Sequence, residues 1–372
     1  MIRLFALIPF LGILYSQIIY VGDDKIREGV HAFYNYDFDK SLKILNKARV
    51  EYPDHPGVHF IWAAAKWTKS MAYDPVDTAH AVLEKSLAEI LPIYEKLTKK
   101  FFLDSNYKLY YGSAIGLSAR VPLAKKSWLS TFFRSYKGFK KINQSARDDP
   151  NMLDAKLPLG LVEYYVFMTD SFLKHAIKLY GLNPSKVQGI NKISIAADSS
   201  SWAWIEACGI LSFIYLWIDD DPILAANYSR KLVNNFPKNF YFNILLLEAN
   251  IKNNRFQEAK IQIKDLKEAM INLTSRQKSW YKPYLDYEIA LLSFKEKKYD
   301  QALDYVNRAI DNYSGELDVV LGFCYLLKGN ILDLSQDRFG AKTCYNSCID
   351  LNNFSGAISR AKGFIDKPYF IP

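Results

Sequence analysis

Residues 280–356 have the sequence WYKPYLDYEIALLSFKEKKYDQALDYVNRAIDNYSGELDVVLGFCYLLKGNILDLSQDRFGAKTCYNSCIDLNNFSG. Small residues recur in it at an offset of 39 positions, so that Ala302 matches Ala341 and Ala309 matches Cys348. Two antiparallel helices approach closely only where side chains are small, while larger apolar residues fill the grooves on either side. The segment therefore predicts two helical hairpins in tandem.

The spacing inside each hairpin indicates the kind of repeat. A small residue of the first helix, Ala290 or Gly329, precedes a small residue of the second helix by 12 positions. This spacing is typical of tetratricopeptide repeats, whose period is about 34 residues. A related turn at residues 36–39 extends the pattern toward the amino terminus. We therefore predict an all-α fold, a right-handed α-α superhelix (a tetratricopeptide-like solenoid) whose concave surface binds other molecules.

Composition and charge agree with a helical core. Of the 372 residues, 50% are hydrophobic and 15% aromatic, whereas only 17 glycines and 14 prolines interrupt the chain. The formal net charge is +9, but Lys and Arg are spread along the chain. A nucleic-acid-binding surface needs these cations gathered into a patch. We expect no nucleic-acid partner, and at most weak attraction to an anionic membrane surface.

The amino terminus has the pattern of a secretory signal. Arg3 supplies a positive start, and residues 4–14 form an apolar run of the usual length. We expect cleavage after Ser16. Because apolar residues resume at positions 18–21, an uncleaved membrane anchor is the alternative. Both alternatives predict export, to the periplasm or to the outer membrane.

The regularity of the repeats divides the remaining chain into three parts. We expect tetratricopeptide-like helices over 17–105, a divergent helical region over 106–200, and further repeats with a terminal cap over 201–372. The signal occupies residues 1–16.

Several individual helices are also predicted. A long helix is expected over residues 78–102, with Asp77 as its cap and a kink or break at Pro92. The divergent region should contain a continuous helix over 121–147, and Ser185 should cap a later helix over 186–197. Further helices are expected over residues 23–53 (as a hairpin), 57–73, 107–119, 155–169, 173–180 and 357–365.

A basic and aromatic run at residues 125–141 is the main surface candidate. Its aromatic residues share one helical face, and its cations lie on the other. One interpretation is an amphipathic helix docked in the core, with a solvated basic face. The other is contact with an anionic lipid or an acidic protein surface. The candidate contact residues are Lys125, Lys126, Trp128, Arg134, Lys137, Lys140 and Lys141.

Cysteine and histidine patterns do not indicate a metal site. His55 and His59 are four positions apart, but Pro56 and Gly57 lie between them and make a shared helix face unfavourable. Buried thiols are the default for the cysteines. In an oxidising compartment, the predicted hairpins would also allow a disulfide among Cys324, Cys344 and Cys348. We expect no metal and no cofactor.

The sequence contains no pattern of a known catalytic site. It has no glycine-rich phosphate loop, no Gly-x-Ser-x-Gly elbow and no His-Glu-x-x-His motif. We therefore expect a protein that is not an enzyme.

The central region resembles a particular branch of tetratricopeptide proteins. The segments YYGSAIGLSAR (110–120) and KKSWLSTFFRSYKGFKKINQSARDDPNMLDAKLPLGLVEYYVFM (125–168) carry this resemblance. The family includes eukaryotic lipid-droplet and inclusion-clearance factors and many secreted bacterial relatives. The resemblance implies an all-helical interaction protein without known chemistry, and no catalytic residue is carried over from it.

These observations lead to one functional hypothesis and one alternative. The hypothesis is a non-catalytic, exported helical-repeat scaffold that mediates protein–protein interaction in the cell envelope and binds a protein or peptide partner. The alternative is a helical protein that binds a solute or lipid in a cavity formed by the aromatic middle region. An open groove would favour the first, and a closed apolar cavity in the middle would favour the second.

Overall fold

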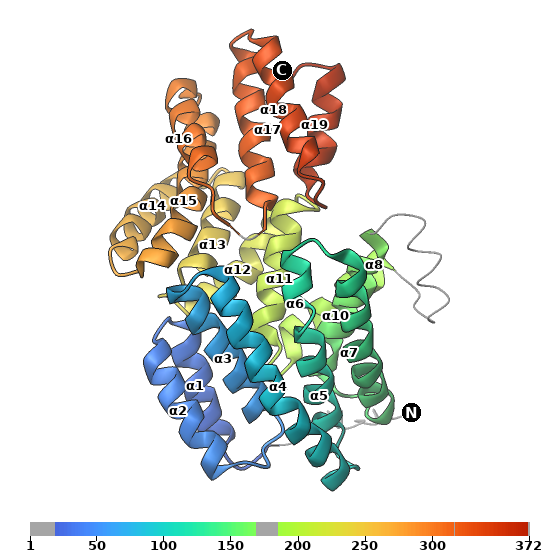
Figure 1. The fold of residues 1–372 in the computed structure, drawn as a ribbon. Helices are drawn as coiled ribbons and strands as arrows, with labels where there is room; N and C mark the ends of the chain where they lie inside the picture. Colours follow the sequence, from blue (N-terminus) through green and yellow to red (C-terminus); the bar gives the residue numbers. More distant parts are fainter. Residues whose placement is uncertain (1–18, 169–184, 316, 371–372) are drawn as a thin grey trace, which may run out of the picture.

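The computed structural model describes residues 19–168, 185–315 and 317–370, and every regular element within these ranges is a helix. The predicted all-α superhelix of hairpins is confirmed (Figure 1). The signal at residues 1–16 and the helix expected over 173–180 lie outside the described residues. In the part of the chain that is described, every helix is too short or too polar to cross a bilayer.

Antiparallel hairpins make up both ends of the chain. The amino-terminal hairpins are α1 (Asp23–Tyr34) with α2 (Phe38–Glu51), and α3 (Val58–Tyr73) with α4 (Val76–Lys100). The carboxyl-terminal hairpins are α11 (Trp204–Trp217) with α12 (Pro222–Asn235), α13 (Phe240–Lys252) with α14 (Phe256–Met270), α15 (Ser275–Lys295) with α16 (Tyr299–Asp311), and α17 (Val319–Leu334) with α18 (Arg338–Asp350). Helix α19 (Gly356–Asp366) packs on α17 and α18, at the end where the sequence predicts a cap.

Small residues hold the hairpins together as the spacing predicts. Ala302, Ala341 and Cys348 are completely buried. A Cβ atom on Gly29 would lie 2.8 Å from the side chain of Leu45 on the partner helix. Since real Cβ atoms do not approach so closely, this crossing needs glycine.

The turns between paired helices share one backbone conformation. A residue with a positive φ angle stands two positions before the second helix in several hairpins: Tyr36 (64°), Asn254 (58°), Lys297 (62°) and Gln336 (64°). The left-handed conformation is unfavourable for residues with a Cβ atom, so its recurrence marks a turn geometry common to the repeats. Lys126 (51°) has the same position in the divergent region. The middle therefore keeps the turn of the repeats.

The divergent region is built from two further helix pairs. Its elements are α5 (Ser105–Leu117), α6 (Arg120–Ala124), α7 (Trp128–Asp148), the 3₁₀ turn η1 (Leu153–Ala155), α8 (Lys156–Met168) and α10 (Lys186–Ser199). Helix α5 pairs with α7, and α8 with α10. A Cβ atom on Gly138 would lie 2.6 Å from the carbonyl oxygen of Gly112, and one on Gly160 would lie 2.7 Å from that of Gly189. Glycine thus faces glycine at both crossings.

The boundaries and caps of three helices differ in how well the sequence predicts them. The single helix predicted over 121–147 is wrong, because the left-handed Lys126 separates α6 from α7. Asp77 lies in the first turn of α4 and is not its cap, and α4 continues through Pro92 without ending there. The predicted cap at Ser185 is confirmed, since its hydroxyl accepts a hydrogen bond of 3.2 Å from the backbone N–H of Gln188.

The first hairpins pack back against the carboxyl-terminal repeats. The hydroxyls of Tyr36 and Tyr281 are 3.0 Å apart, and the Asn239 amide donates to the carbonyl oxygen of Tyr34 over 2.8 Å. The hydroxyl of Thr274 donates to the carbonyl oxygen of Ala72. Figure 1 shows the amino-terminal helices α1 and α3, in blue, beside the yellow α13. The superhelix therefore curves far enough for α1–α3 to contact α13 and the start of α15.

Candidate functional site

The predicted basic and aromatic run lies mainly on α7. Phe132, Tyr136 and Phe139 pack with Val166 of α8, as expected for a docked amphipathic helix. Phe133 on the same helix remains 49% exposed. Trp128 begins α7, but its side chain lies outside the described part of the structure.

The cations of this run are not equivalent. Lys126 Nζ lies 2.7 Å from Asp318 Oδ2 and 3.0 Å from the carbonyl oxygen of Leu351, so it ties the α6–α7 turn to the carboxyl-terminal repeats. Arg134 donates to the carbonyl oxygen of Ser118 over 3.0 Å. The ammonium of Lys141 lies 5.6 Å from the ring centre of Tyr111. Lys125, Lys137 and Lys140 are exposed, and contact of this face with an anionic surface stays a prediction.

The four cysteines are free thiols in the interior. The disulfide that the sequence left open among Cys324, Cys344 and Cys348 is not formed. Burial raises the pKa of Cys348 to about 12 and that of Cys324 well above its usual range. Thiols in such surroundings stay protonated and react slowly, so these residues act as small apolar packing groups.

The two histidines considered as metal ligands hold the α2–α3 connection. His55 Nε2 lies 2.8 Å from Asp23 Oδ1, and His55 Nδ1 accepts from the backbone N–H of Gly57 over 3.1 Å. His59 Nε2 lies 2.8 Å from the carbonyl oxygen of Pro53. Burial lowers the pKa of His59. Both rings are therefore satisfied by neighbours in the protein.

An aromatic groove lies on the layer formed by the first helices of the carboxyl-terminal hairpins. Helices α11, α13, α15 and α17 pack side by side in this layer. The groove has a volume of about 200 Å³, and α6 contributes Arg120 to it. Its other lining residues are Phe213, Trp217, Tyr241, Trp280, Tyr281, Tyr284, Leu317, Val319 and Val320. Burial raises the pKa of Tyr241 and Tyr281 well above the usual range, so their hydroxyls are neutral at physiological pH.

A buried charge network fixes the wall of the groove. The indole N–H of Trp217 donates to Glu248 Oε2 over 2.6 Å, and Glu248 Oε1 lies 2.8 Å from Lys252 Nζ. Glu288 on α15 is completely buried beside this pair. Burial, followed by the charge of Glu248, raises the pKa of Glu288 well above its usual range. The raised pKa favours the protonated form of Glu288, which is able to donate a hydrogen bond to Glu248.

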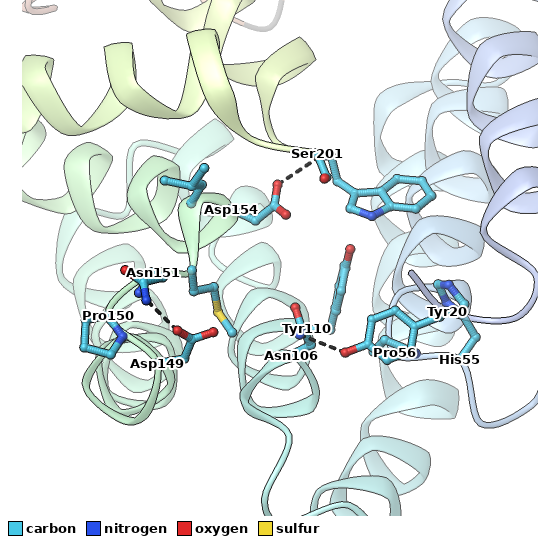
Figure 2. A pocket seen from close by; sticks show the side chains of 13 residues that line it. Tyr20, His55, Pro56, Asn106, Tyr110, Asp149, Pro150, Asn151, Asp154 and Ser201 are labelled. Carbon is cyan, nitrogen blue, oxygen red and sulfur yellow. Dashed lines mark hydrogen bonds between the residues drawn. The ribbon is translucent and has the colours of Figure 1, made fainter. Parts of the chain in front are cut away.

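A second hollow lies where the amino-terminal repeats meet the divergent region. This cavity has a volume of about 310 Å³ and is shown in Figure 2. It is bounded by the segment before α1, the α2–α3 turn, α5, the loop at 149–152 with the start of η1, and residues 201–202. Its lining residues are Tyr20, His55, Pro56, Asn106, Tyr110, Asp149, Pro150, Asn151, Met152, Leu153, Asp154, Ser201 and Trp202.

The sequence did not single out either hollow. Residues 149–155 and Tyr110 belong to the segments that carry the family resemblance, and His55 was considered only as a metal ligand. The groove residues were expected only as apolar positions of a helical core. Their role depends on how successive hairpins stack, and no local pattern specifies that stacking.

Comparison with known proteins relates the chain to solved helical-repeat structures. No family model and no curated protein matches the sequence. A chain of the APC/C hetero-tetramer Cut9–Hcn1 is similar, with a TM-score of 0.53 and 13% identity over 91% of this chain and 54% of that one. This protein therefore spans about half the length of that chain. At this identity the likeness concerns the fold alone, a tetratricopeptide-like superhelix.

Two further structures are less similar. A human IFIT1 dimer with PPP-AAAA has a TM-score of 0.45 and 12% identity, covering 93% of this chain and 85% of that one. NprR in complex with its cognate peptide NprX has a TM-score of 0.43 and 12% identity, covering 92% and 81%.

Proposed function

We propose that the protein is a non-catalytic scaffold that binds an extended segment of a protein partner in the aromatic groove. The observation that carries this proposal is that four successive first helices direct side chains into one groove. Trp and Tyr provide large, rigid contact areas and are enriched among residues that dominate binding energy at protein interfaces. The lining offers contact area and does not bring a nucleophile together with a base.

The size of the groove favours a side chain over a lipid. Pockets that enclose small-molecule ligands usually have volumes of about 300–1,000 Å³. The groove has about 200 Å³, which is enough for an apolar side chain of a bound segment. Lipid or solute binding is retained as the second candidate because the lining is aromatic. If the groove binds a lipid, the protein should bind a fluorescent fatty acid, and a peptide bound in the groove should prevent this binding.

The place of action is a separate part of the proposal. We propose export to the cell envelope, supported by the pattern of residues 1–16, with an uncleaved anchor as the alternative. Cell fractionation with amino-terminal sequencing of the mature protein tests it. A chain that begins at Gln17 in the periplasmic or outer-membrane fraction is expected, and a cytoplasmic protein that begins at Met1 would contradict it. Relationship to the lipid-droplet and inclusion-clearance family is proposed on the central segments alone.

Selection from a library of random peptides tests the binding site. We expect selected peptides to share an aromatic or aliphatic anchor residue. Their affinity for the Trp280→Ala variant should be lower by about tenfold or more. Truncation of an aromatic residue that dominates binding costs about 2 kcal/mol or more, and about 1.4 kcal/mol already corresponds to a tenfold change in affinity.

Phe339→Ala is the matched control for this test. Phe339 lies on α18, outside the groove, and is 86% exposed. Phe339→Ala removes an aromatic ring, as Trp280→Ala does. Because this ring lies outside the groove, the affinity for the peptides should remain that of the wild type. Thermal unfolding of both variants checks that they are folded. Peptides that bind all three proteins equally would contradict a site in the groove.

A further inference from the structure

The cavity in Figure 2 has walls that are fixed by hydrogen bonds within the protein. Asp154 Oδ1 accepts from the backbone N–H groups of Trp202 (2.9 Å) and Ala203 (2.7 Å). The Tyr20 hydroxyl donates to Asp104 Oδ2 over 2.7 Å and accepts from the Asn106 amide over 2.8 Å. A site whose groups are already held in place loses little conformational freedom when it binds a ligand.

The electrostatic character of the cavity is opposite to that of the whole chain. The protein has a formal net charge of +9, yet the described residues that line the cavity include two aspartates, Asp149 and Asp154, and no Lys or Arg. Arg27 lies beside it, with its guanidinium 4.1 Å from the ring centre of Trp202 and 3.0 Å from the carbonyl oxygen of Ser201. Carboxylates in a partly enclosed space attract a cation more strongly than carboxylates in open water.

Tyr110 provides an independent indication that a ligand belongs in the cavity. The side chain is 9% exposed, and a Cβ atom on Gly57 would lie 2.9 Å from its ring, so the ring is tightly held. In Figure 2 its hydroxyl points into the cavity, toward the side where Asp154 lies. That hydroxyl forms no hydrogen bond with any residue of the described part of the chain. The hydroxyl is the part of this otherwise buried side chain that faces the cavity, so it can accept a hydrogen bond from a ligand with an N–H group.

We propose that this cavity binds an organic ammonium ion, of the size of a short diamine or a lysine side chain. Its ammonium group contacts the carboxylate of Asp154 and donates to the Tyr110 hydroxyl, whereas Asp149 lies at the other end of the cavity. The rings of Trp202 and Tyr20 line the cavity and cover the methylene chain of the ligand. A volume of about 310 Å³ is at the lower end of the range for small-molecule sites.

The site is separate from the proposed peptide groove. None of the residues that line the cavity lines the groove. Failure of one proposal therefore leaves the other standing.

Isothermal titration calorimetry with the full-length protein tests the site. Putrescine is the probe for a free diamine, and N-acetyl-lysine methylamide is the probe for a lysine side chain of a partner. Butanediol matches putrescine in length but carries no charge. We expect at least one of the two cations to bind and butanediol not to bind. Binding of putrescine alone indicates a free amine, and binding of the lysine derivative indicates a protein side chain.

Two variants and one control locate the binding. Asp154→Asn removes one charge and keeps the acceptor for the two backbone N–H groups, and Tyr110→Phe removes only the hydroxyl. Each should weaken cation binding about tenfold, as expected for the loss of one charged or polar contact. Asp304→Asn removes one exposed charge on α16 and should leave the affinity unchanged.

Three results would overturn the proposal. One is that neither cation binds more tightly than butanediol. Another is that Asp304→Asn weakens binding as much as Asp154→Asn, because the cation would then respond only to overall charge. The third is that Tyr110→Phe, with an unchanged melting temperature, binds the cation as well as the wild type does.

Discussion

Replacing Glu288 with glutamine tests the buried charge network behind the groove. Glu288 on α15 faces Glu248 on α13, and both carboxyl groups are completely buried. Glu248 is paired with Lys252 at 2.8 Å, and among the described residues no donor gives a hydrogen bond to either oxygen of Glu288. The proton carried by Glu288 therefore supplies the hydrogen bond between the two carboxyl groups. Glutamine has nearly the same shape and provides an N–H donor at every pH.

The effect on stability follows from the difference in pKa between the two states. An unfolded glutamate has a pKa of about 4.3, whereas burial and Glu248 raise the pKa of Glu288 in the folded protein. Below about pH 4.3 both states hold the proton, and the raised pKa makes no difference. Above it the unfolded state loses the proton and the folded state keeps it. The free energy of unfolding then falls by about 1.4 kcal/mol per pH unit, until the folded pKa is reached.

Urea unfolding at several values between about pH 5 and about pH 8 measures this contribution. We expect Glu288→Gln to be more stable than the wild type at the upper end of the range, with an advantage that shrinks as the pH falls. Glu258→Gln, an exposed site on α14, is the control and should follow the wild type. If Glu288→Gln and the wild type have the same pH dependence, Glu288 is not a protonated acid in the folded state and the reasoning is refuted.

Three further outcomes follow from the packing and the charges. Gly138→Ala should lower the free energy of unfolding by about 1–3 kcal/mol, because its methyl group would lie 2.6 Å from backbone atoms of α5. Gly116→Ala is the control, since a methyl group there meets open space and should change the stability little. Denaturant titration of both variants measures the difference. The four buried cysteines should react with a thiol reagent only when the protein unfolds, and rapid reaction of the native protein would contradict their burial. If α7 contacts anionic membranes, replacing Lys137 and Lys140 with glutamate should abolish co-sedimentation with phosphatidylserine vesicles at low salt, since each lysine contributes about 1 kcal/mol of binding energy. Vesicle binding that persists in this variant and at high salt would argue against that contact.

The hairpins were predictable because their determinants are local. Ala302 and Ala341 are small at equivalent positions, and close helix crossing permits little else there. The break at Lys126 was missed because lysine is a good helix former, and its left-handed conformation results from packing of the α6–α7 turn. Lys126 contacts Asp318 and Leu351, residues far away in sequence.

The candidate sites were not predictable, for a related reason. Each repeat specifies its own hairpin, but small rotations between repeats accumulate and determine which distant segments meet. The contact of Tyr36 with Tyr281, and the cavity that brings Tyr20 near Asp154, both depend on this accumulated curvature. The sequence could identify the divergent middle as the place to search. It could not identify the residues that gather there.

Photo-crosslinking in the organism that makes the protein tests the groove most directly. A benzophenone amino acid is placed at Tyr241 in the groove and, in a second strain, at Phe339 on the exposed surface of α18. We expect light to produce a covalent adduct with a distinct protein from the groove position and none from the α18 position. No protein adduct from the groove position, or the same adduct from both positions, would contradict the claim that the aromatic groove holds a protein partner.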